Sequence, residues 1–155
     1  MKNIITSIIA ILIIPFTGLN AQSISEHNGS LIQHNGEFLE GDFETFYTNG
    51  TTHEIFQILN GKQHGEYISY SINGKLIEKG TYNFGKKFGK WTKFSPDGNL
   101  ISETFYNVKG KKHGSWKIFD SNNNLKAIMV YENGNRVGEW KIWDEKGNIA
   151  QVISY

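Results

Sequence analysis

The sequence predicts an all-β protein: an elongated, single-sheet antiparallel meander of stacked β-hairpins, with about five repeats of 24 residues. Glycines recur at near-equal intervals, an aromatic residue follows each of them, and a turn signal follows the aromatic. Self-similarity at a fixed period is typical of repeat architectures. The anchor glycines, separated by 24, 24, 25 and 24 residues, are Gly41, Gly65, Gly89, Gly114 and Gly138.

The first strand of each predicted hairpin carries two aromatic positions. Two places after the anchor glycines stand Phe43, Tyr67, Trp91, Trp116 and Trp140. Five places after them stand Phe46, Tyr70, Phe94, Phe119 and Trp143. Side chains alternate between the two faces of a strand, so these offsets have opposite parity. Either the first strand carries a bulge, or the sheet packs aromatic residues on both faces.

A turn signal closes each hairpin nine places after the anchor glycine. The residues there are Gly50, Gly74, Gly98, Asn123 and Gly147. Asn is the non-glycine residue that best tolerates a positive φ, so Asn123 suits the same turn. An Asn-Gly or Asp-Gly pair between two apolar runs is a strong hairpin signal.

The second strand follows each turn, and a glycine-containing return loop leads to the next repeat. The second strands read 76–82, 100–106, 125–131 and 149–155, with a more divergent first copy at 52–58. The return loops contain Asn60-Gly61, Phe84-Gly85, Lys109-Gly110 and Asn133-Gly134, and the extra residue of the 25-residue gap precedes the third of these. Repeats therefore start near residues 37, 60, 84, 109 and 133, within a domain spanning 22–155. Residues 22–36 hold a partial copy, with Asn28-Gly29 as its turn.

Residues 1–21 have the pattern of a secretory signal peptide. Lys2 precedes an apolar run from Ile4 to Phe16, and a small residue, Ala21, ends the segment. The alternative is a retained membrane anchor, but the run is shorter than the roughly 20 residues of a spanning helix. We expect cleavage after Ala21 and a secreted or periplasmic protein.

The overall charge is nearly balanced, with 16 Lys and Arg against 15 Asp and Glu, and there is no cysteine. Nucleic-acid binding is therefore not expected. Locally, residues 37–54 sum to −5, whereas residues 86–117 carry eight lysines against two acidic residues. The return-loop lysines are expected to line one edge, where they either bind an anionic partner or form a solvated surface. These are Lys86, Lys87, Lys111 and Lys112.

Two stretches resemble a known repeat. Residues 83–91 with Asp97-Gly98, and residues 133–140 with Lys146-Gly147, are similar to the bacterial variant of the MORN repeat, roughly Gly-Lys-x-x-Gly-x-Trp followed by a strand and Asp/Asn-Gly. The resemblance covers residues 37–155 and implies a binding protein. Proteins of this kind are commonly labelled antitoxin components of toxin–antitoxin systems, so it also implies a partner toxin.

The pattern predicts no catalytic residue, no cofactor site and no metal site. His64 and His113 share a slot that holds Glu40, Phe88 or Val137 in other copies, which indicates a tolerant loop position rather than a ligand. No serine stands in a recognisable triad pattern, and the glycine loops lead into strands rather than into the helix that a phosphate loop requires. We expect a protein that is not an enzyme.

Trp91, Trp116 and Trp140 recur once per repeat and should form a ladder. One interpretation is packing, because large aromatic residues dominate burial in small folds. The other is an exposed track for sugar rings or quaternary ammonium groups. The sequence favours a protein-interaction scaffold, with a cell-surface glycan or phospholipid binding module and an antitoxin-like protein as alternatives.

The last predicted strand, 149–155, lacks the Lys and Pro residues that usually protect a sheet edge, and no capping repeat follows it. We expect that this edge pairs with another chain, either a second copy or a partner.

Overall fold

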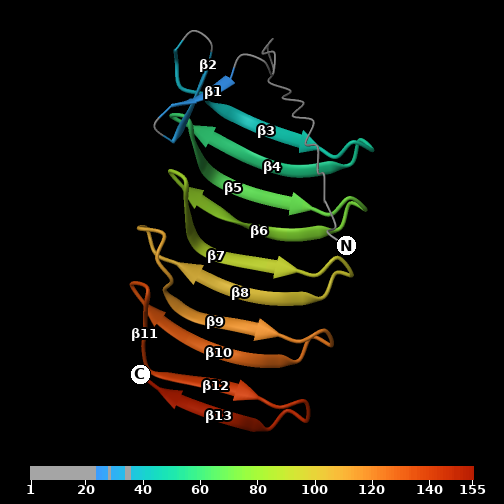
Figure 1. Cartoon of the computed structure of the whole chain (residues 1–155), viewed down its shortest axis with the longest axis vertical. Coiled ribbons are helices and arrows are strands. Elements are labelled where there is room, and N and C mark those ends of the chain that lie inside the picture. The colour runs from blue at the N-terminus through green and yellow to red at the C-terminus, as the bar shows by residue number, and fades with distance from the viewer. Residues whose placement is uncertain (1–23, 28, 34–35) are drawn as a thin grey trace, which may run out of the picture.

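The computed structural model describes residues 24–27, 29–33 and 36–155 (Figure 1). The predicted signal peptide and its cleavage site lie outside these residues. Within the described part of the chain, no helix has the length and apolar character needed to cross a membrane.

One antiparallel sheet forms the body of the molecule, and it confirms the predicted meander of consecutive hairpins. Each strand between the two edge strands, β3 and β13, pairs with the strand before it and the strand after it in the sheet, as Figure 1 shows. The strands are β3 (Gly41–Phe46), β4 (Thr52–Leu59), β5 (Lys62–Tyr70), β6 (Leu76–Asn83), β7 (Lys86–Phe94), β8 (Leu100–Tyr106), β9 (Gly114–Phe119), β10 (Leu125–Glu132), β12 (Glu139–Trp143) and β13 (Ile149–Ser154). A short strand, β11 (Asn135–Arg136), pairs with the end of β10.

The partial copy forms a separate hairpin of β1 (Ile24–His27) and β2 (Ser30–Gln33). It therefore does not continue the main sheet as a strand. It is tied to the first return loop by Leu31 N–H, which donates to the Gly61 carbonyl at 2.8 Å. Leu39 bridges the same two segments, because its N–H donates to the Leu31 carbonyl and its carbonyl accepts from Gly61 N–H, both at 2.9 Å. Leu39 is buried with Phe43 and Ile58, so this end of the sheet has a small apolar core.

The hairpin turns have the predicted backbone. Gly50, Gly74, Gly98 and Gly147 all have positive φ, and Asn123 adopts φ 63° in the same slot. Each turn is closed by two backbone hydrogen bonds across five residues. In the third, for example, Ser95 N–H donates to the Asn99 carbonyl at 2.8 Å.

The return loops are of two kinds. In three of them both central residues have positive φ, the requirement of a type I′ turn. These are Asn60-Gly61, Phe84-Gly85 and Asn133-Gly134. In the remaining loop, Asn107 N–H donates to the Lys111 carbonyl at 2.9 Å, and the Asn107 side chain accepts from Lys109 N–H and Lys111 N–H. The extra residue of the 25-residue gap thus converts a tight turn into a longer loop, with Val108 at its tip.

The anchor glycines Gly65 and Gly89 lie at bulges. Between the pairs Lys79–Thr92 and Thr81–Phe88, the single residue Gly80 stands opposite three residues of β7, Gly89 among them. All five anchors have positive φ, from 62° to 124°. A Cβ added at Gly89 would meet no atom within 4 Å, so the backbone conformation, and not a close aromatic cover, selects glycine there.

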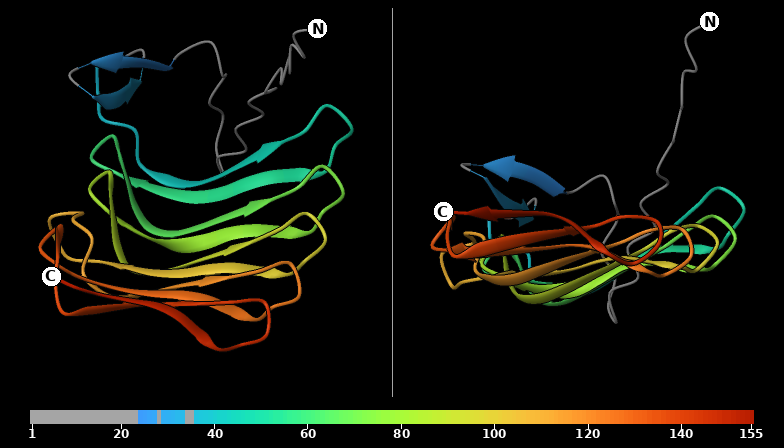
Figure 2. Two further views of the ribbon diagram at one scale, coloured as in Figure 1. Left: turned by 60° about the horizontal axis from the view of Figure 1, so that its bottom comes forward. Right: turned by 90° about the horizontal axis from the view of Figure 1, so that it is seen from below.

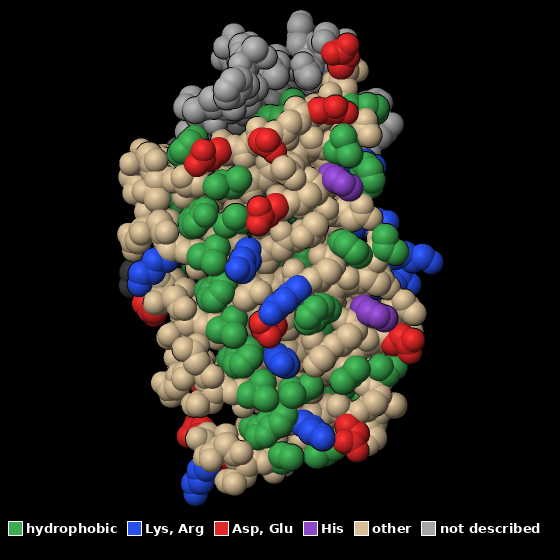
Figure 3. Space-filling model, turned by 180° about the vertical axis from the view of Figure 1, so that it is seen from behind, with side chains coloured by type: hydrophobic (Ala, Val, Ile, Leu, Met, Phe, Trp, Pro, Cys, Tyr) green, Lys and Arg blue, Asp and Glu red, His purple; other side chains and the backbone are tan. Residues whose placement is uncertain are grey.

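The register also shows that aromatic residues pack on both faces. Pairing runs without interruption from Phe43 to Thr45, and the extra residue, His53, lies in the partner strand. Phe46 therefore faces away from Phe43. We call the face with the offset-two aromatics the ladder face and the other the second face. The sheet is a twisted ribbon (Figure 2), and Figure 3 looks on to its second face.

Candidate functional site

The ladder face is a continuous stack of rings toward the C-terminal end. From Tyr106 through Trp116, Tyr131 and Trp140 to Tyr155, consecutive ring centroids lie 4.8 to 5.2 Å apart. Further along, Trp91 contacts Tyr82 at 4.9 Å and Tyr67 at 5.5 Å. Tilted and edge-on arrangements at these distances are the favourable ones for aromatic pairs.

The tryptophans are packing residues and not an exposed track. Trp91, Trp116 and Trp140 are only 1%, 9% and 8% exposed. Each indole N–H donates to a carbonyl of the preceding hairpin, at 2.9 to 3.1 Å; the acceptors are Thr81, Phe105 and Val130. Each tryptophan thereby joins its own hairpin to the one before it. The exposed-track interpretation was wrong.

Basic side chains cover the ladder at the position two places before the anchor glycine. Lys87 Nζ lies 3.7 Å from the ring centroid of Trp91, Lys112 Nζ lies 4.4 Å from that of Trp116, and the Arg136 guanidinium carbon lies 5.0 Å from that of Trp140. These are cation–π distances. Lys87 also forms an ion pair with Glu78 at 2.8 Å. Arg136 was not predicted as a site residue, although it shares with Lys87 and Lys112 the spacing of two residues from the anchor glycine.

The four predicted return-loop lysines therefore separate into two pairs. Lys87 and Lys112 lie over the ladder, whereas Lys86 and Lys111 lie at the return-loop edge and are exposed. The side chains of Lys86 and Lys111 lean on the next loop: a Cβ added at Gly110 would come 2.9 Å from Lys86 Cβ, and one at Gly134 would come 3.7 Å from Lys111 Cβ.

Burial perturbs the tyrosines of the ladder. The pKa of Tyr67 is raised well above its usual range, first by burial and then by Glu54, whose carboxylate accepts the phenol hydrogen bond at 2.7 Å. Burial also raises the pKa of Tyr82 and of Tyr106. These phenols stay neutral and serve packing.

Two carboxylates that the sequence reading passed over hold the last two hairpin turns. Asp120 accepts from Asn122 N–H at 2.8 Å and from Asn124 N–H at 2.9 Å, and Asp144 makes the equivalent bonds. These hydrogen bonds lower the pKa of both carboxyls. The largest cause is the backbone N–H four places after each Asp, which belongs to Asn124 for Asp120 and to Asn148 for Asp144. Ser95 occupies the same slot in the repeat before Asp120, so a small polar residue six places after the anchor glycine was the available sequence signal.

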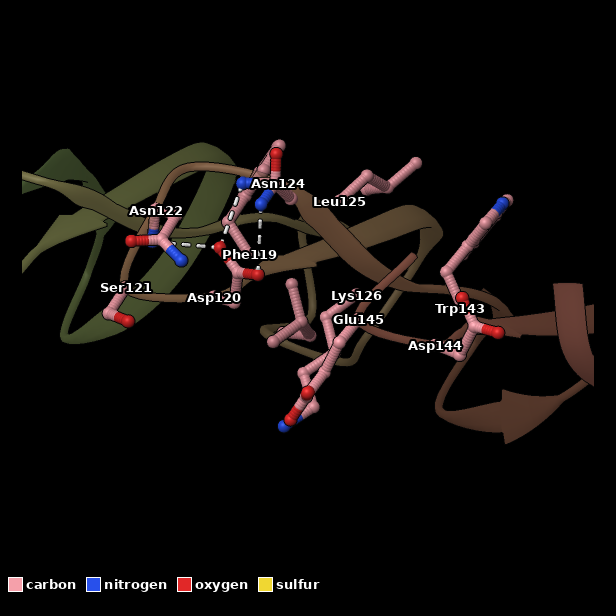
Figure 4. A pocket seen from close by; sticks show the side chains of 11 residues that line it. Phe119, Asp120, Ser121, Asn122, Asn124, Leu125, Lys126, Trp143, Asp144 and Glu145 are labelled. Atoms are coloured by element: carbon pink, nitrogen blue, oxygen red, sulfur yellow. Dashed lines mark hydrogen bonds between the residues drawn. The ribbon is translucent and has the colours of Figure 1, made fainter. Parts of the chain in front are cut away.

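A surface groove of about 720 Å³ lies between these two turns (Figure 4). Its lining includes Asp120, Asn124, Trp143 and Asp144. The two carboxylates already accept the turn hydrogen bonds, so the groove presents mainly satisfied polar groups and the aromatic rings of Phe119 and Trp143. No three His, Asp or Glu residues within the described ranges converge in a way that would hold a metal ion.

His64 is packed in the return-loop edge. Its ring lies 4.5 Å from that of Phe84, and its Nδ1 is 3.4 Å from Phe84 N–H. Phe84 has φ 45°, a left-handed conformation that costs a non-glycine residue about 1–2 kcal/mol.

The repeat pattern matches a family model described as the MORN repeat variant, over residues 63–83, 89–107, 112–133 and 136–155. No curated protein matches the sequence. The four matches cover more than half of the chain and fall on the last four hairpins of the sheet. The first hairpin, β3–β4, lies outside the match but has the same register and the same turn. The chain belongs to the MORN repeat variant family.

Proposed function

We propose that this protein is a non-enzymatic interaction scaffold that binds another protein through the second face and the loop edges of its ribbon. The family supports a binding role. One observation carries the proposal. The residues that recur in every copy, mainly Gly, Trp and Tyr, build the ladder face, whereas the residues that differ between copies lie on the second face and the loop edges.

The second face has the composition of a protein interface. A row of register partners crosses the sheet and combines two isoleucines and a threonine with four charged residues: Ile68, Lys79, Thr92, Glu103, Lys117, Ile128 and Lys141. Beside the hairpin turns runs a half-buried apolar column, whose paired members include Phe94 with Leu100 and Phe119 with Leu125. Figure 3 shows hydrophobic side chains along this side of the sheet, with basic ones across its middle. Apolar anchors with charged neighbours are typical of protein-binding surfaces.

The proposal can be tested by placing a photo-crosslinking amino acid in the protein and irradiating the cells that produce it. Placed at Phe94 or Phe119 it samples the second face, and placed at Tyr106 it samples the ladder face as a matched control. We expect a discrete protein adduct from the first two sites and none from the third. Adducts from the ladder site alone, or from no site, contradict the proposal.

We propose further that the chain works outside the cytoplasm as a secreted or periplasmic protein. The support is the pattern of residues 1–21, and the test is mass spectrometry of the mature N-terminus. A chain beginning at Gln22 is the expected result. An intact N-terminus contradicts it.

The alternatives use the same surfaces. An antitoxin-like role requires a toxin that the second face neutralises by contact, and the crosslinked adduct identifies it. A glycan or phospholipid binding role is favoured only by the exposed Lys86 and Lys111, because the tryptophans are buried.

A further inference from the structure

The return-loop edge of the third repeat carries four exposed apolar residues, two on strands of the second face and two on the return loops beside them. Phe84, Phe88, Phe105 and Val108 are 45%, 42%, 38% and 60% exposed. Phe105 of β8 lies opposite Lys90 of β7, and Phe88 stands two residues before Lys90 on the same strand. Phe88 itself pairs with Thr81 of β6. The rings of Phe88 and Phe105 are therefore diagonal neighbours on the second face. We call these four residues the return-edge patch. Figure 3 shows hydrophobic side chains gathered along this edge.

The patch is specific to one part of the chain. The slot of Phe84 holds Asn60 and Asn133 in two other return loops, with φ 51° in both. Asn tolerates that conformation, whereas Phe is strained in it. The slot of Phe88 holds His64 in another copy, and that of Phe105 holds Thr81. Phe84 thus stands in a slot where other copies have Asn, although Phe is strained there and its ring is exposed. Such strain is kept where function requires it, so we infer that the exposed ring of Phe84 has a function.

The patch is surrounded by free positive charge. Among the described residues, Lys86, Lys109 and Lys111 take part in no ion pair or cation–π contact, unlike Lys87, Lys90 and Lys112. All three stand on the two return loops that carry Phe84 and Val108. Phe84 and Lys86 also line a groove of about 460 Å³ that runs past Gly61 to Leu31. The return-edge patch and the adjoining groove both have lysines beside them, and this arrangement suits an extended ligand.

We propose that the return-edge patch docks an acidic segment of a partner protein, which places a large apolar side chain among the phenylalanines and carboxylates beside the lysines. This inference rests on the proposed scaffold function and names the chemistry of its partner. Charge complementarity selects the acidic segment, since residues 86–117 carry eight lysines against Asp97 and Glu103.

The test uses variants that borrow residues from other copies, so that the fold is preserved. The triple variant Phe84→Asn, Phe88→His, Phe105→Thr removes the patch. The double variant Lys86→Asn, Lys111→Asn removes the charge and takes its residue from Asn135, which holds the same slot. Ile72→Ser is the matched control, because Ile72 is 50% exposed at a hairpin turn and Ser121 fills its slot in another copy. Thermal unfolding checks that each variant folds.

The probe is a displayed library of random linear peptides, selected on the whole mature chain. We expect enrichment of sequences rich in Asp and Glu around Phe, Trp or Leu. Affinity for a selected peptide, measured by fluorescence anisotropy, should fall about tenfold or more in the triple variant and remain unchanged in Ile72→Ser. It should also fall in the double variant and with added salt.

Three results overturn the inference: selected peptides without acidic residues, unchanged affinity in the triple variant, or binding of phosphatidylglycerol vesicles in place of any peptide. The crosslinking experiment separates this inference from the scaffold function. If the triple variant still forms the adduct at Phe94 or Phe119, the scaffold stands and the return-edge patch is not its docking site.

Discussion

Trp91 lies directly against the backbone of Gly80, so that a Cβ added at Gly80 would come 2.2 Å from Trp91 Cδ2. Trp91 is also the most deeply buried ring of the ladder. In the other copies the slot of Gly80 holds a side chain, such as Thr104 or Met129, and the neighbouring tryptophans are less buried. Gly80 is therefore needed for space, in contrast to the anchor glycine Gly89.

Gly80→Ala should destabilise the protein by about 1–3 kcal/mol, the usual range for overpacking a core. Urea unfolding measures the loss. In a Trp91→Tyr background, which takes its residue from Tyr67 in the same slot, the cost of Gly80→Ala should shrink because the smaller ring leaves room. Equal costs in both backgrounds would contradict the steric explanation.

Gly89→Ala should cost about 1–2 kcal/mol for a different reason, because φ there is 65° while the space around it is open. Gly89→Asn should cost less than Gly89→Ala, since Asn tolerates the left-handed region. The ranking of the two urea midpoints is the measurement. Equal midpoints for Ala and Asn would show that backbone conformation is not what the anchor requires.

Acid should weaken the last two turns through Asp120 and Asp144. Both carboxyls have a pKa below the ordinary value of 3.8 in the folded chain, so their stabilising contribution is complete above that value and is lost as the pH falls through the lowered folded pKa. The double variant Asp120→Asn, Asp144→Asn should therefore lose less stability than wild type when urea unfolding is followed from neutral pH to about pH 2. Asp97→Asn is the control, because the Asp97 carboxylate accepts no hydrogen bond from the described residues. An identical acid dependence in wild type and double variant would refute the capping role.

Tryptophan fluorescence should report a buried ladder. Trp143, which lies outside the ladder and is half-buried, is first replaced by Phe, the residue of its slot in the third and fourth copies. The emission of the remaining three should be blue-shifted from that of free tryptophan and unchanged by added cell-surface glycan. A glycan-dependent shift in this variant would revive the aromatic ligand track.

The outer edge of β13 should promote self-association. Among the described strands it pairs with β12 alone, and Ile149 and Val152 are 55% and 48% exposed. Val152→Lys places a charge on this strand and should reduce association, whereas Ile72→Lys, on a turn, should not. Sedimentation of the mature chain measures both, and a strictly monomeric wild type at tens of micromolar counts against pairing through β13.

Much of the fold was predictable because it depends on local backbone chemistry. The positive φ of Gly98 and Asn123 follows from residue type, and the period fixes which strands are neighbours. The faces were not predictable, because the parity of a strand depends on where a bulge inserts its extra residue. The extra residue, His53, falls in β4 and not between Phe43 and Phe46, so those two rings lie on opposite faces.

The surface was harder to predict than the fold for a related reason. Lys86 and Lys87 are adjacent in sequence and chemically identical, yet one lies at the loop edge and the other over Trp91. One residue of register separates those places. The strain at Phe84 was likewise invisible until the φ of its loop was known.

The strand order, in which every member of the main sheet touches only its immediate neighbours in the chain, makes the protein divisible. Deleting residues 90–114, from just after one anchor glycine through the next, would rejoin β7 to β9 at matching points of the ladder. Gain or loss of one such unit shortens or lengthens the sheet by a hairpin while the rest keeps its partners. The number of hairpins, and with it the length of the sheet, can therefore change in evolution without any change in the surface residues of the remaining hairpins.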